Sequence, residues 1–368
     1  MSKNITRRSL AVALSAGFAL SEESAQENAQ ESKATVRFPR KIRLAMLGLE
    51  GHSGLITEPL ARLPDVALTA IYDRDAAAMA KFAKQPFASS ARLYSDYEEM
   101  LRKEDIDVVA VCGPHMERAP AILACVAHGR NAIAEKPLAF ERADLDKIRQ
   151  SATRAKVHLG MLLPMRFEGV YRKMREIVRS GAVGEVAQIE GQKSYKLGQR
   201  ADFMLHRASY GGTIPYIGVH SVDLMRFTTG REMTEVFSMQ SHIGFPDYGE
   251  MENTTASVFR LDNKGVAVLR MDFLRPATAP THGDDRLRIA GTEGVLEYQE
   301  QTGLTLVTGR EKPRTITDLP AAGSVFVDYL ESVYLGKPPG LPVADIYRVN
   351  EIVLAAREAA ETGRVLKV

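Results

Sequence analysis

An acid, a lysine and a proline directly follow one apolar strand pattern: Glu135, Lys136 and Pro137 come after Asn131 to Ala134. Carboxylate and ammonium groups bind polar ligands and transfer protons. Ligands of open α/β sheets bind beyond the carboxyl ends of the strands, so Glu135 and Lys136 would lie where a cofactor and a substrate meet. The bond before Pro137 is a candidate for the cis form. Because an isolated Glu-Lys-Pro tripeptide is more often an ordinary solvated turn, its surroundings have to support this interpretation.

A second group of polar side chains falls on one predicted helix, 210–226. Tyr216, His220 and Asp223 are spaced i, i+4 and i+7, which puts a phenol, an imidazole and a carboxylate on one face of a largely apolar helix. Such a line can do acid-base chemistry, because an imidazole gains and loses protons near neutral pH. The alternative is a buried hydrogen-bonded network that holds the helix to its sheet, and this alternative is favoured for Asp223.

Glycines mark a turn near the start of the globular pattern. The run from Gly48 to Gly54 follows an apolar strand pattern and is spaced G-x-x-G-x-x-G, with Glu50 in place of the second glycine of the usual G-x-G-x-x-G. Glycines there let the backbone approach a dinucleotide pyrophosphate, and the helix that follows stabilises its charge. The turn predicts that Gly48, Glu50, Gly51 and His52 line a cofactor site.

The acid that such a site needs follows at Asp73, at the end of the next strand pattern and 25 residues after Gly48. Asp73 would accept hydrogen bonds from the adenosine ribose and disfavour a 2′-phosphate, which indicates NAD. Arg74 beside it could instead stack on adenine or accept NADP. Pro114 and His115 end another strand pattern and fall on the same rim, although a lone histidine is more often structural.

Alternating strand and helix patterns position these residues. Repeated β-α alternation predicts a Rossmann-type, doubly wound parallel sheet over residues 40–160, the dinucleotide-binding domain. The strands are expected at 41–47, 66–72, 92–94, 107–112, 131–134 and 157–163. The helices are expected at 55–62, 75–84, 97–103, 117–128 and 142–156.

The pattern changes after residue 160. A long amphipathic helix at 168–180 is followed by seven strand patterns with few helices between them. These strands are expected at 185–196, 235–242, 254–260, 266–273, 286–289, 294–299 and 304–307. They predict a C-terminal α+β domain over residues 161–342, with a mainly antiparallel open sheet that helices cover on one face. The uncovered face is a candidate contact for a homodimer or homotetramer.

The composition is that of an ordinary globular protein of 368 residues, 45% hydrophobic and 26% charged. This length predicts two domains. A net charge of +2 argues against nucleic acid or an anionic membrane as a partner. Cys112 and Cys125 are the two cysteines, and no Cys-x-x-Cys or Cys/His cluster is present. We therefore expect neither a metal site nor a disulfide, with both thiols in the core.

Two arginines precede a short apolar run at the N-terminus. Arg7 and Arg8 stand before Ala11 to Leu20, a run too short for stable membrane insertion. This pattern resembles a twin-arginine export signal and predicts a periplasmic or secreted protein, with residues 1–39 as signal and polar linker. The departures are Leu10, where phenylalanine is more usual, and the lack of a sharp cleavage motif. The alternative is a disordered basic tail on a cytoplasmic protein.

Several motifs in a fixed order resemble those of the Gfo/Idh/MocA family, the glucose-fructose oxidoreductase and inositol dehydrogenase type enzymes. The resemblance covers roughly residues 40 to 368, including a terminal helix within 343–363 of the kind that returns to the cofactor domain. Several motifs together are more specific than any one of them. They are Gly48 to Asp73, Pro114-His115, Glu135-Lys136-Pro137, Met165-Arg166-Phe167, Gly181 to Glu185 and Gly211 to Asp223.

What the resemblance implies is a nicotinamide-dependent oxidoreductase acting on a sugar or cyclitol. Lys136 would bind the reacting hydroxyl and assist its proton, and His220 would be the acid/base beside it. The sequence departs from the family at two positions. Glu50 stands in the glycine turn where a glycine is usual, and Tyr216 stands where an aspartate is usual. The phenol of Tyr216 could relay a proton. Contacts to the carbohydrate are expected from Arg166, Tyr195, His206, Arg207 and Asp223.

Export would restrict this chemistry. Free NAD is not expected outside the cytoplasm, so an exported enzyme would hold its nicotinamide tightly and regenerate it in place. That favours a redox-neutral cycle: either paired oxidation and reduction of two sugars or, as in some exported members of the family, NAD-dependent glycoside hydrolysis. A non-catalytic carbohydrate-binding protein that retains the fold is a further alternative.

Overall fold

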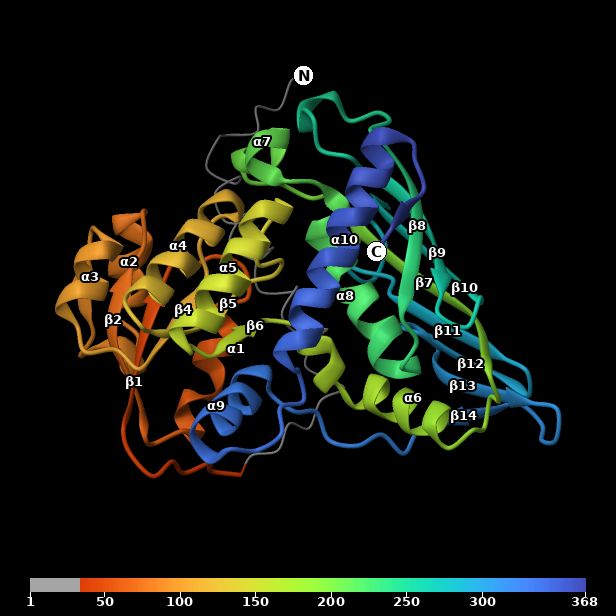
Figure 1. Ribbon diagram of the computed structural model, residues 1–368, viewed down its shortest axis with the longest axis horizontal. Coiled ribbons are helices and arrows are strands. Elements are labelled where there is room, and N and C mark those ends of the chain that lie inside the picture. The colour runs from red at the N-terminus through yellow and green to blue at the C-terminus, as the bar shows by residue number, and fades with distance from the viewer. Residues whose placement is uncertain (1–33) are drawn as a thin grey trace, which may run out of the picture.

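The computed structural model of the protein describes residues 34–368, so the Arg7-Arg8 pair and the apolar run after it lie outside the described residues. Two sheets stand apart with long helices between them (Figure 1). The first sheet has the strand order β3-β2-β1-β4-β5-β6. Its strands are β1 (Ile42–Leu47), β2 (Val66–Tyr72), β3 (Arg92–Tyr94), β4 (Val108–Val111), β5 (Asn131–Ala134) and β6 (Leu159–Met161).

All neighbouring strands of the first sheet pair in parallel, which confirms the predicted Rossmann-type sheet. The strand order reverses between β1 and β4, and such a switch point is where open α/β sheets bind their ligands. Five α-helices follow the strands in turn. They are α1 (Gly54–Thr57), α2 (Ala76–Phe82), α3 (Tyr97–Lys103), α4 (His115–Ala127) and α5 (Arg142–Ala155).

The helix after the glycine turn differs from the prediction of one helix at 55–62. The α-helix α1 stops at Thr57 and a 3-10 helix continues over Glu58–Arg62. Pro59 lies in this second segment and has no N–H group, so it cannot donate the hydrogen bond that would extend α1. The helix that follows β1 is therefore only one turn long.

The second sheet has the strand order β14-β13-β12-β11-β7-β10-β9-β8-β15. Only β7 and β10 pair in parallel among its described strands, which confirms a mainly antiparallel sheet. The first strands are β7 (Val186–Lys196), β8 (Met233–Ser241), β9 (Thr254–Leu261), β10 (Val266–Arg275) and β11 (Arg286–Gly291). The others are β12 (Gly294–Gln299), β13 (Gly303–Thr308), β14 (Arg314–Ile316) and β15 (Leu366–Lys367).

Helices cover the face of this sheet that looks toward the first one, as Figure 1 shows. Alternate residues of β9, such as Phe259, are buried under them, whereas Val258 on the same strand and Met239 on β8 are exposed on the other face. The helices of this half are α6 (Gly169–Arg179), α7 (Arg207–Tyr210), α8 (Thr213–Thr229), α9 (Val325–Leu335) and α10 (Val343–Thr362).

The C-terminal part joins the two halves of the chain. Helix α10 packs against α8 and β8 and also contacts α5 and β6. Asn350 on α10 accepts a hydrogen bond at 2.9 Å from the backbone N–H of Leu138, just after the Glu135-Lys136-Pro137 motif. The sequence patterns did not predict β14, α9 or β15.

The cysteine prediction is confirmed for the core: Cys112 and Cys125 are both buried free thiols. Within residues 34–368, no helix has the length and apolarity needed to cross a membrane.

Candidate active site

The glycine turn after β1 has a shape that only glycine allows. Gly48 has φ +86°, and a Cβ atom there would lie 2.5 Å from the backbone nitrogen of Gly113. Gly51 has φ +62°, and its Cβ would lie 2.4 Å from the carboxylate of Glu135. Side chains at these positions would collide with the loops after β4 and β5. The turn therefore packs directly against these two loops at the rim of the sheet, where a dinucleotide site is expected.

A hollow at the same rim has the groups that an adenosine needs. Asp73 is buried, and its carboxylate accepts hydrogen bonds from the backbone N–H groups of Leu49 at 2.8 Å and Asp75 at 2.7 Å. Arg74 lies at the edge, between the carboxylates of Glu50 at 3.0 Å and Glu117 at 3.5 Å. The hollow is lined by Leu47, Gly48, Glu50, Tyr72, Asp73, Arg74, Tyr97, Gly113, Pro114, Glu117 and Ala121.

Glu50 is thus compatible with this hollow although it replaces a glycine. Its backbone N–H donates to the carbonyl of Cys112 at 2.9 Å, and its side chain turns outward to Arg74. Burial raises the pKa of the Glu50 carboxyl, and the Arg74 charge opposes that rise. The glycine cradle, the buried Asp73 and the flat hollow between them fit a dinucleotide.

Glu135 anchors the opposite side of the glycine turn. Its Oε1 accepts hydrogen bonds from the backbone N–H of His52 and, at 2.8 Å, from His52 Nδ1, while Oε2 accepts from the backbone N–H of Lys136 at 3.0 Å. Burial alone would raise the pKa of Glu135, but the hydrogen bond from His52 and the nearby positive charges of Lys136 and Arg118 lower it to about 2. Glu135 is therefore a fixed negative charge in the site.

Lys136 reaches from the rim of the first sheet to α8. Its Nζ donates to the carbonyl of Tyr216 at 2.9 Å and lies 4.1 Å from the centre of that tyrosine ring. The peptide bond between Lys136 and Pro137 is cis. Burial lowers the pKa of Lys136 to about 8, although the Glu135 charge opposes this. A buried lysine with such a pKa can give and take a proton near neutral pH.

His220 lies one turn further along α8. Its side chain is buried, and Nδ1 has no hydrogen-bond partner within residues 34–368. The ring meets that of His52 edge to face, with 5.9 Å between the centroids. Burial, followed by the positive charges of Lys136 and Lys193, holds the pKa of His220 well below its usual value. The structure thus brings Lys136, Tyr216 and His220 together, with His220 neutral.

His115 lies at the predicted rim, just after β4, and its ring centroid is 4.8 Å from that of Tyr216. It is the first residue of α4 and is buried, with its ring stacked on Phe140 at 4.9 Å and its Nδ1 bonded to the carbonyl of Tyr210 at 2.8 Å. Burial and the nearby Arg118 charge lower its pKa to about 3. The imidazole is a neutral packing group, whereas its neighbour Pro114 lines the hollow.

Arg166 and Asp223 form a buried ion pair, which matches the structural alternative weighed for Asp223. Arg166 Nε and Nη2 both bind the Asp223 carboxylate, the first at 3.0 Å, and both side chains are 2% exposed. Nη1 donates to the carbonyl of Gly340 at 2.9 Å and contacts Asp345 at 3.3 Å. These contacts engage all three guanidinium nitrogens of Arg166, so it fixes α8 instead of lining an open pocket.

The other predicted carbohydrate contacts are spread out. Arg207 pairs with Glu252 and with Glu361, and His206 beside it is exposed. Tyr195 stacks on His282 with 5.4 Å between the ring centroids. No hydrogen bond or ion pair joins these side chains to Lys136 among the described residues, although Tyr195 lies close enough to Lys193 for each to affect the pKa of the other.

Two charged side chains near Lys136 were missed by the sequence analysis. Arg118 is buried and donates to the carbonyls of Lys136 at 2.9 Å and Pro137 at 2.8 Å, which fixes the turn. Lys193 on β7 is buried and pairs with Asp285, and its charge acts on both Lys136 and His220. A sequence signal was available for Arg118, because it lies one turn into α4 after a strand-end proline. No such signal marked Lys193.

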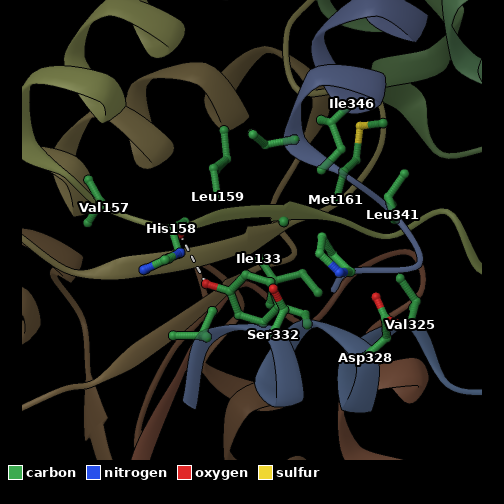
Figure 2. Close-up of a pocket in the computed structure, with 15 residues that line it drawn as sticks. Ile133, Val157, His158, Leu159, Met161, Val325, Asp328, Ser332, Leu341 and Ile346 are labelled. Atoms are coloured by element: carbon green, nitrogen blue, oxygen red, sulfur yellow. Dashed lines mark hydrogen bonds between the residues drawn. The ribbon is translucent and has the colours of Figure 1, made fainter. Parts of the chain in front are cut away.

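A separate cavity of about 230 Å³ lies between β6, α9 and α10 (Figure 2). Its walls are mainly apolar, with Ile133, Leu159 and Ile346 among them, and the hydroxyl of Tyr329 donates to the carbonyl of His158 at 3.0 Å along one side. None of the predicted site residues lines it. The cavity is therefore separate from the candidate active site.

The fold and the rim define a nicotinamide-dependent oxidoreductase. Residues 42–162 match the model of the oxidoreductase family with an NAD-binding Rossmann fold, and residues 171–297 match the GFO/IDH/MocA C-terminal domain. The chain belongs to the Gfo/Idh/MocA oxidoreductase family, as the resemblance indicated, and its first domain is an NAD-binding Rossmann domain.

Several relatives cover nearly the same length. A solved oxidoreductase from Thermotoga maritima is 30% identical, with a TM-score of 0.82 over 89% of this chain and 100% of its own. The myo-inositol 2-dehydrogenase of Thermotoga maritima is 24% identical over 89% of this chain and 98% of its own. An aldose-aldose oxidoreductase from Caulobacter crescentus shares the fold, with 22% identity and a TM-score of 0.77 over 89% of this chain and 100% of its own.

Proposed function

We propose that the protein oxidises a hydroxyl group of a sugar or cyclitol, with NAD held at the rim of the first sheet. The observation that carries this proposal is the placement of Lys136: it ends β5 beside the glycine turn, and its Nζ lies against α8 one turn before His220. A substrate there would contact both the cofactor site and two titratable groups. The relationship to a myo-inositol 2-dehydrogenase supports a polyol substrate.

The groups have distinct tasks in this proposal. When bound, NAD accepts the hydride that leaves the substrate carbon. Neutral Lys136 takes the hydroxyl proton, because its pKa of about 8 leaves a useful fraction of free amine near neutral pH. Neutral His220 forms a hydrogen bond to the same hydroxyl and orients it. Glu135, with a pKa of about 2, stays ionised and stabilises the positive charge that Lys136 gains.

Asp73 and Arg74 set the choice of nucleotide in the proposal. Asp73 would accept from the adenosine ribose hydroxyls and repel a 2′-phosphate, which favours NAD over NADP. Arg74 pairs with Glu50 and Glu117, so its charge is already compensated by carboxylates.

The first experiment identifies the nucleotide that the protein carries. The protein is purified without added nucleotide and denatured, and released NAD(H) or NADP(H) is measured by absorbance and mass. Near-stoichiometric NAD(H) supports a retentive site. Turnover is then measured on a panel of cyclitols and aldoses, with Lys136→Ala as the control variant that should bind NAD but lose turnover. No release and no binding of added NAD would contradict the proposal.

A second candidate is redox-neutral glycoside hydrolysis, in which bound NAD oxidises the sugar only transiently. The observation that favours it is Tyr216, which stands where the family usually has an aspartate beside the histidine. Cleavage of a chromogenic glycoside that depends on bound NAD but leaves no net NADH would support this candidate. Net NADH formation with a free polyol would support the dehydrogenase instead.

Export and self-association complete the proposal. The twin-arginine pattern predicts a periplasmic or secreted protein, and replacing Arg7 and Arg8 with lysine should retain it in the cytoplasm.

The helix-free face of the second sheet, with Met239 and Val258 exposed, is proposed as the contact of a homodimer or homotetramer. Light scattering of the wild type and of Val258→Lys tests this contact. A wild-type protein with the mass of a monomer, or a Val258→Lys variant with the same oligomeric mass as the wild type, would contradict it.

A further inference from the structure

His52 in the glycine turn is held in one orientation. Its Nδ1 lies 2.8 Å from Oε1 of Glu135. An ionised carboxylate only accepts hydrogen bonds, and Glu135 is ionised, so Nδ1 of His52 carries the hydrogen. In the neutral imidazole this contact selects the tautomer with the hydrogen on Nδ1, so that the lone pair is on Nε2.

His52 also has access to solvent that its neighbours lack. Its side chain is 39% exposed, whereas Lys136 and His220 are 4% and 7% exposed. A proton that oxidation delivers to Lys136 therefore arrives on a buried group. It has to leave before the next turnover, because only the neutral amine can accept another proton.

His52 faces the buried pair on its other side. Its ring meets that of His220 with 5.9 Å between centroids and 78° between planes. No hydrogen bond joins the two rings in the described part of the chain, so transfer of a proton from the buried pair to His52 requires an intervening water. The titratable and charged groups around His52 are Glu135 and Lys136 after β5 and His220 on α8, with Lys193 of β7 acting on His220.

We propose that His52, oriented by Glu135, carries the proton released by substrate oxidation from the Lys136–His220 pair to solvent. The proposal rests on the oxidation proposed above. One N–H bond breaks at Lys136 Nζ and one forms at His52 Nε2 through the bridging water, and the imidazolium then gives its proton to bulk water. The Glu135 carboxylate stabilises that imidazolium. His52 is a positioning and relay residue in this scheme, since it acts on Lys136 through water.

Two variants of the full NAD-loaded chain separate relay from structure. His52→Gln keeps an N–H donor for Glu135 but has no titrating nitrogen, and His52→Ala leaves room for added imidazole. The matched control is His128→Gln, because His128 also pairs with a glutamate, Glu98 at 3.2 Å, and lies at the far end of α4. The probe is the sugar or cyclitol of the panel that the wild type oxidises fastest.

The relay predicts a loss of about 10²-fold in kcat for both His52 variants, with KM and the affinity for NADH changed by less than about twofold. Added imidazole should restore kcat of His52→Ala in proportion to its neutral form and leave His128→Gln and the wild type unchanged. NMR of ¹⁵N-labelled histidine should show His52 protonated at Nδ1.

Three results would overturn the relay. If kcat is unchanged in both His52 variants, His52 does not transfer the proton, although the proposed oxidation still holds. The same conclusion follows if kcat falls, NADH binding weakens and added imidazole does not restore kcat. An Nε2-protonated His52 removes the free lone pair. A wild-type protein that binds NAD yet oxidises nothing in the panel removes the oxidation itself, and the relay with it.

Discussion

The ammonium group of Lys136 lies 4.1 Å from the centre of the Tyr216 ring and donates a hydrogen bond to the carbonyl oxygen of the same residue at 2.9 Å. One side chain of α8 thus contacts the lysine through its ring and its backbone together. Because Tyr216 replaces the acid usual in the family, the lysine contacts a neutral aromatic ring at this position. The negative charge that balances Lys136 comes from Glu135 instead.

The pKa of about 8 for Lys136 predicts how oxidation depends on pH. Oxidation needs the neutral amine as proton acceptor, so kcat/KM for oxidation should rise as pH increases through about 8 and then level off. The reverse reduction needs the charged form and should decline over the same interval. Steady-state rates in both directions at constant ionic strength test this, and an oxidation rate that stays flat between about pH 7 and 9 would rule Lys136 out as the acceptor.

Tyr216 is expected to act through its ring. The Tyr216 hydroxyl has no hydrogen-bond partner among the described residues, so Tyr216→Phe should keep kcat/KM near the wild-type value. Tyr216→Leu removes the cation–π contact, worth about 0.5–2 kcal/mol, and should lower kcat/KM by about 2- to 30-fold. If Tyr216→Phe loses as much activity as Tyr216→Leu, the phenol relays a proton as the family comparison suggested.

Asp223→Asn should destabilise the fold by about 3–5 kcal/mol, because it leaves the buried Arg166 charge without its ionised partner. The measurement is urea unfolding monitored by circular dichroism. The control is Glu235→Gln, which breaks an exposed pair with Arg260 at 3.7 Å and should cost less than about 0.5 kcal/mol. Equal effects of the two substitutions would show that the Arg166–Asp223 pair does not support α8.

Gly51→Ala tests whether the close contact between the glycine turn and Glu135 is needed for NADH binding. Alanine at φ +62° is strained by about 1–2 kcal/mol, and its Cβ would also displace the Glu135 carboxylate. Gly129→Ala is the matched control, with φ +66° and open space around the new Cβ. Both variants should lose stability through this strain, Gly51→Ala the more, but only Gly51→Ala should weaken NADH binding, by about tenfold or more in a fluorescence titration. Equal NADH affinities would contradict this role of the turn.

The first sheet was predictable because its strands are buried on both faces. All four residues of β4 are buried, so they form a continuous apolar run that turn residues bound clearly. The rim followed from the same pattern, since parallel strands bring their carboxyl ends to one edge. Gly48, Asp73 and Lys136 could therefore be placed together without any knowledge of distances.

Partners distant in sequence could not be predicted in this way. Lys193 binds Asp285, 92 residues away, and nothing in the local pattern of β7 sets this lysine apart from a solvated one. The positions of His115 and Arg166 followed from the pattern, but their partners, the carbonyl of Tyr210 and the carboxylate of Asp223, did not. The position of a residue along a strand or helix determines where its Cα atom lies, whereas packing determines which groups its side chain contacts.

Helix α9 shows a different limit. Its sequence is rich in β-branched and aromatic residues, including Val325, Val327 and Tyr329, which favour strands by themselves. The signal for a helix was Ser324, whose side chain accepts a hydrogen bond from the N–H of Val327 and caps the first turn. The cap marks where the helix begins, and burial of its apolar side chains against the rest of the protein stabilises it against the preference of single residues for strands.

The hydrogen bond from Leu138 to Asn350 has a consequence for the order in which the protein is made. When the last strand of the first sheet has been synthesised, the residue that fastens the loop of Lys136 has not yet been made. The active arrangement is therefore delivered only near the end of translation. A chain truncated before Asn350 can still contain every strand of the nucleotide-binding sheet, but the loop of its lysine lacks this fastening.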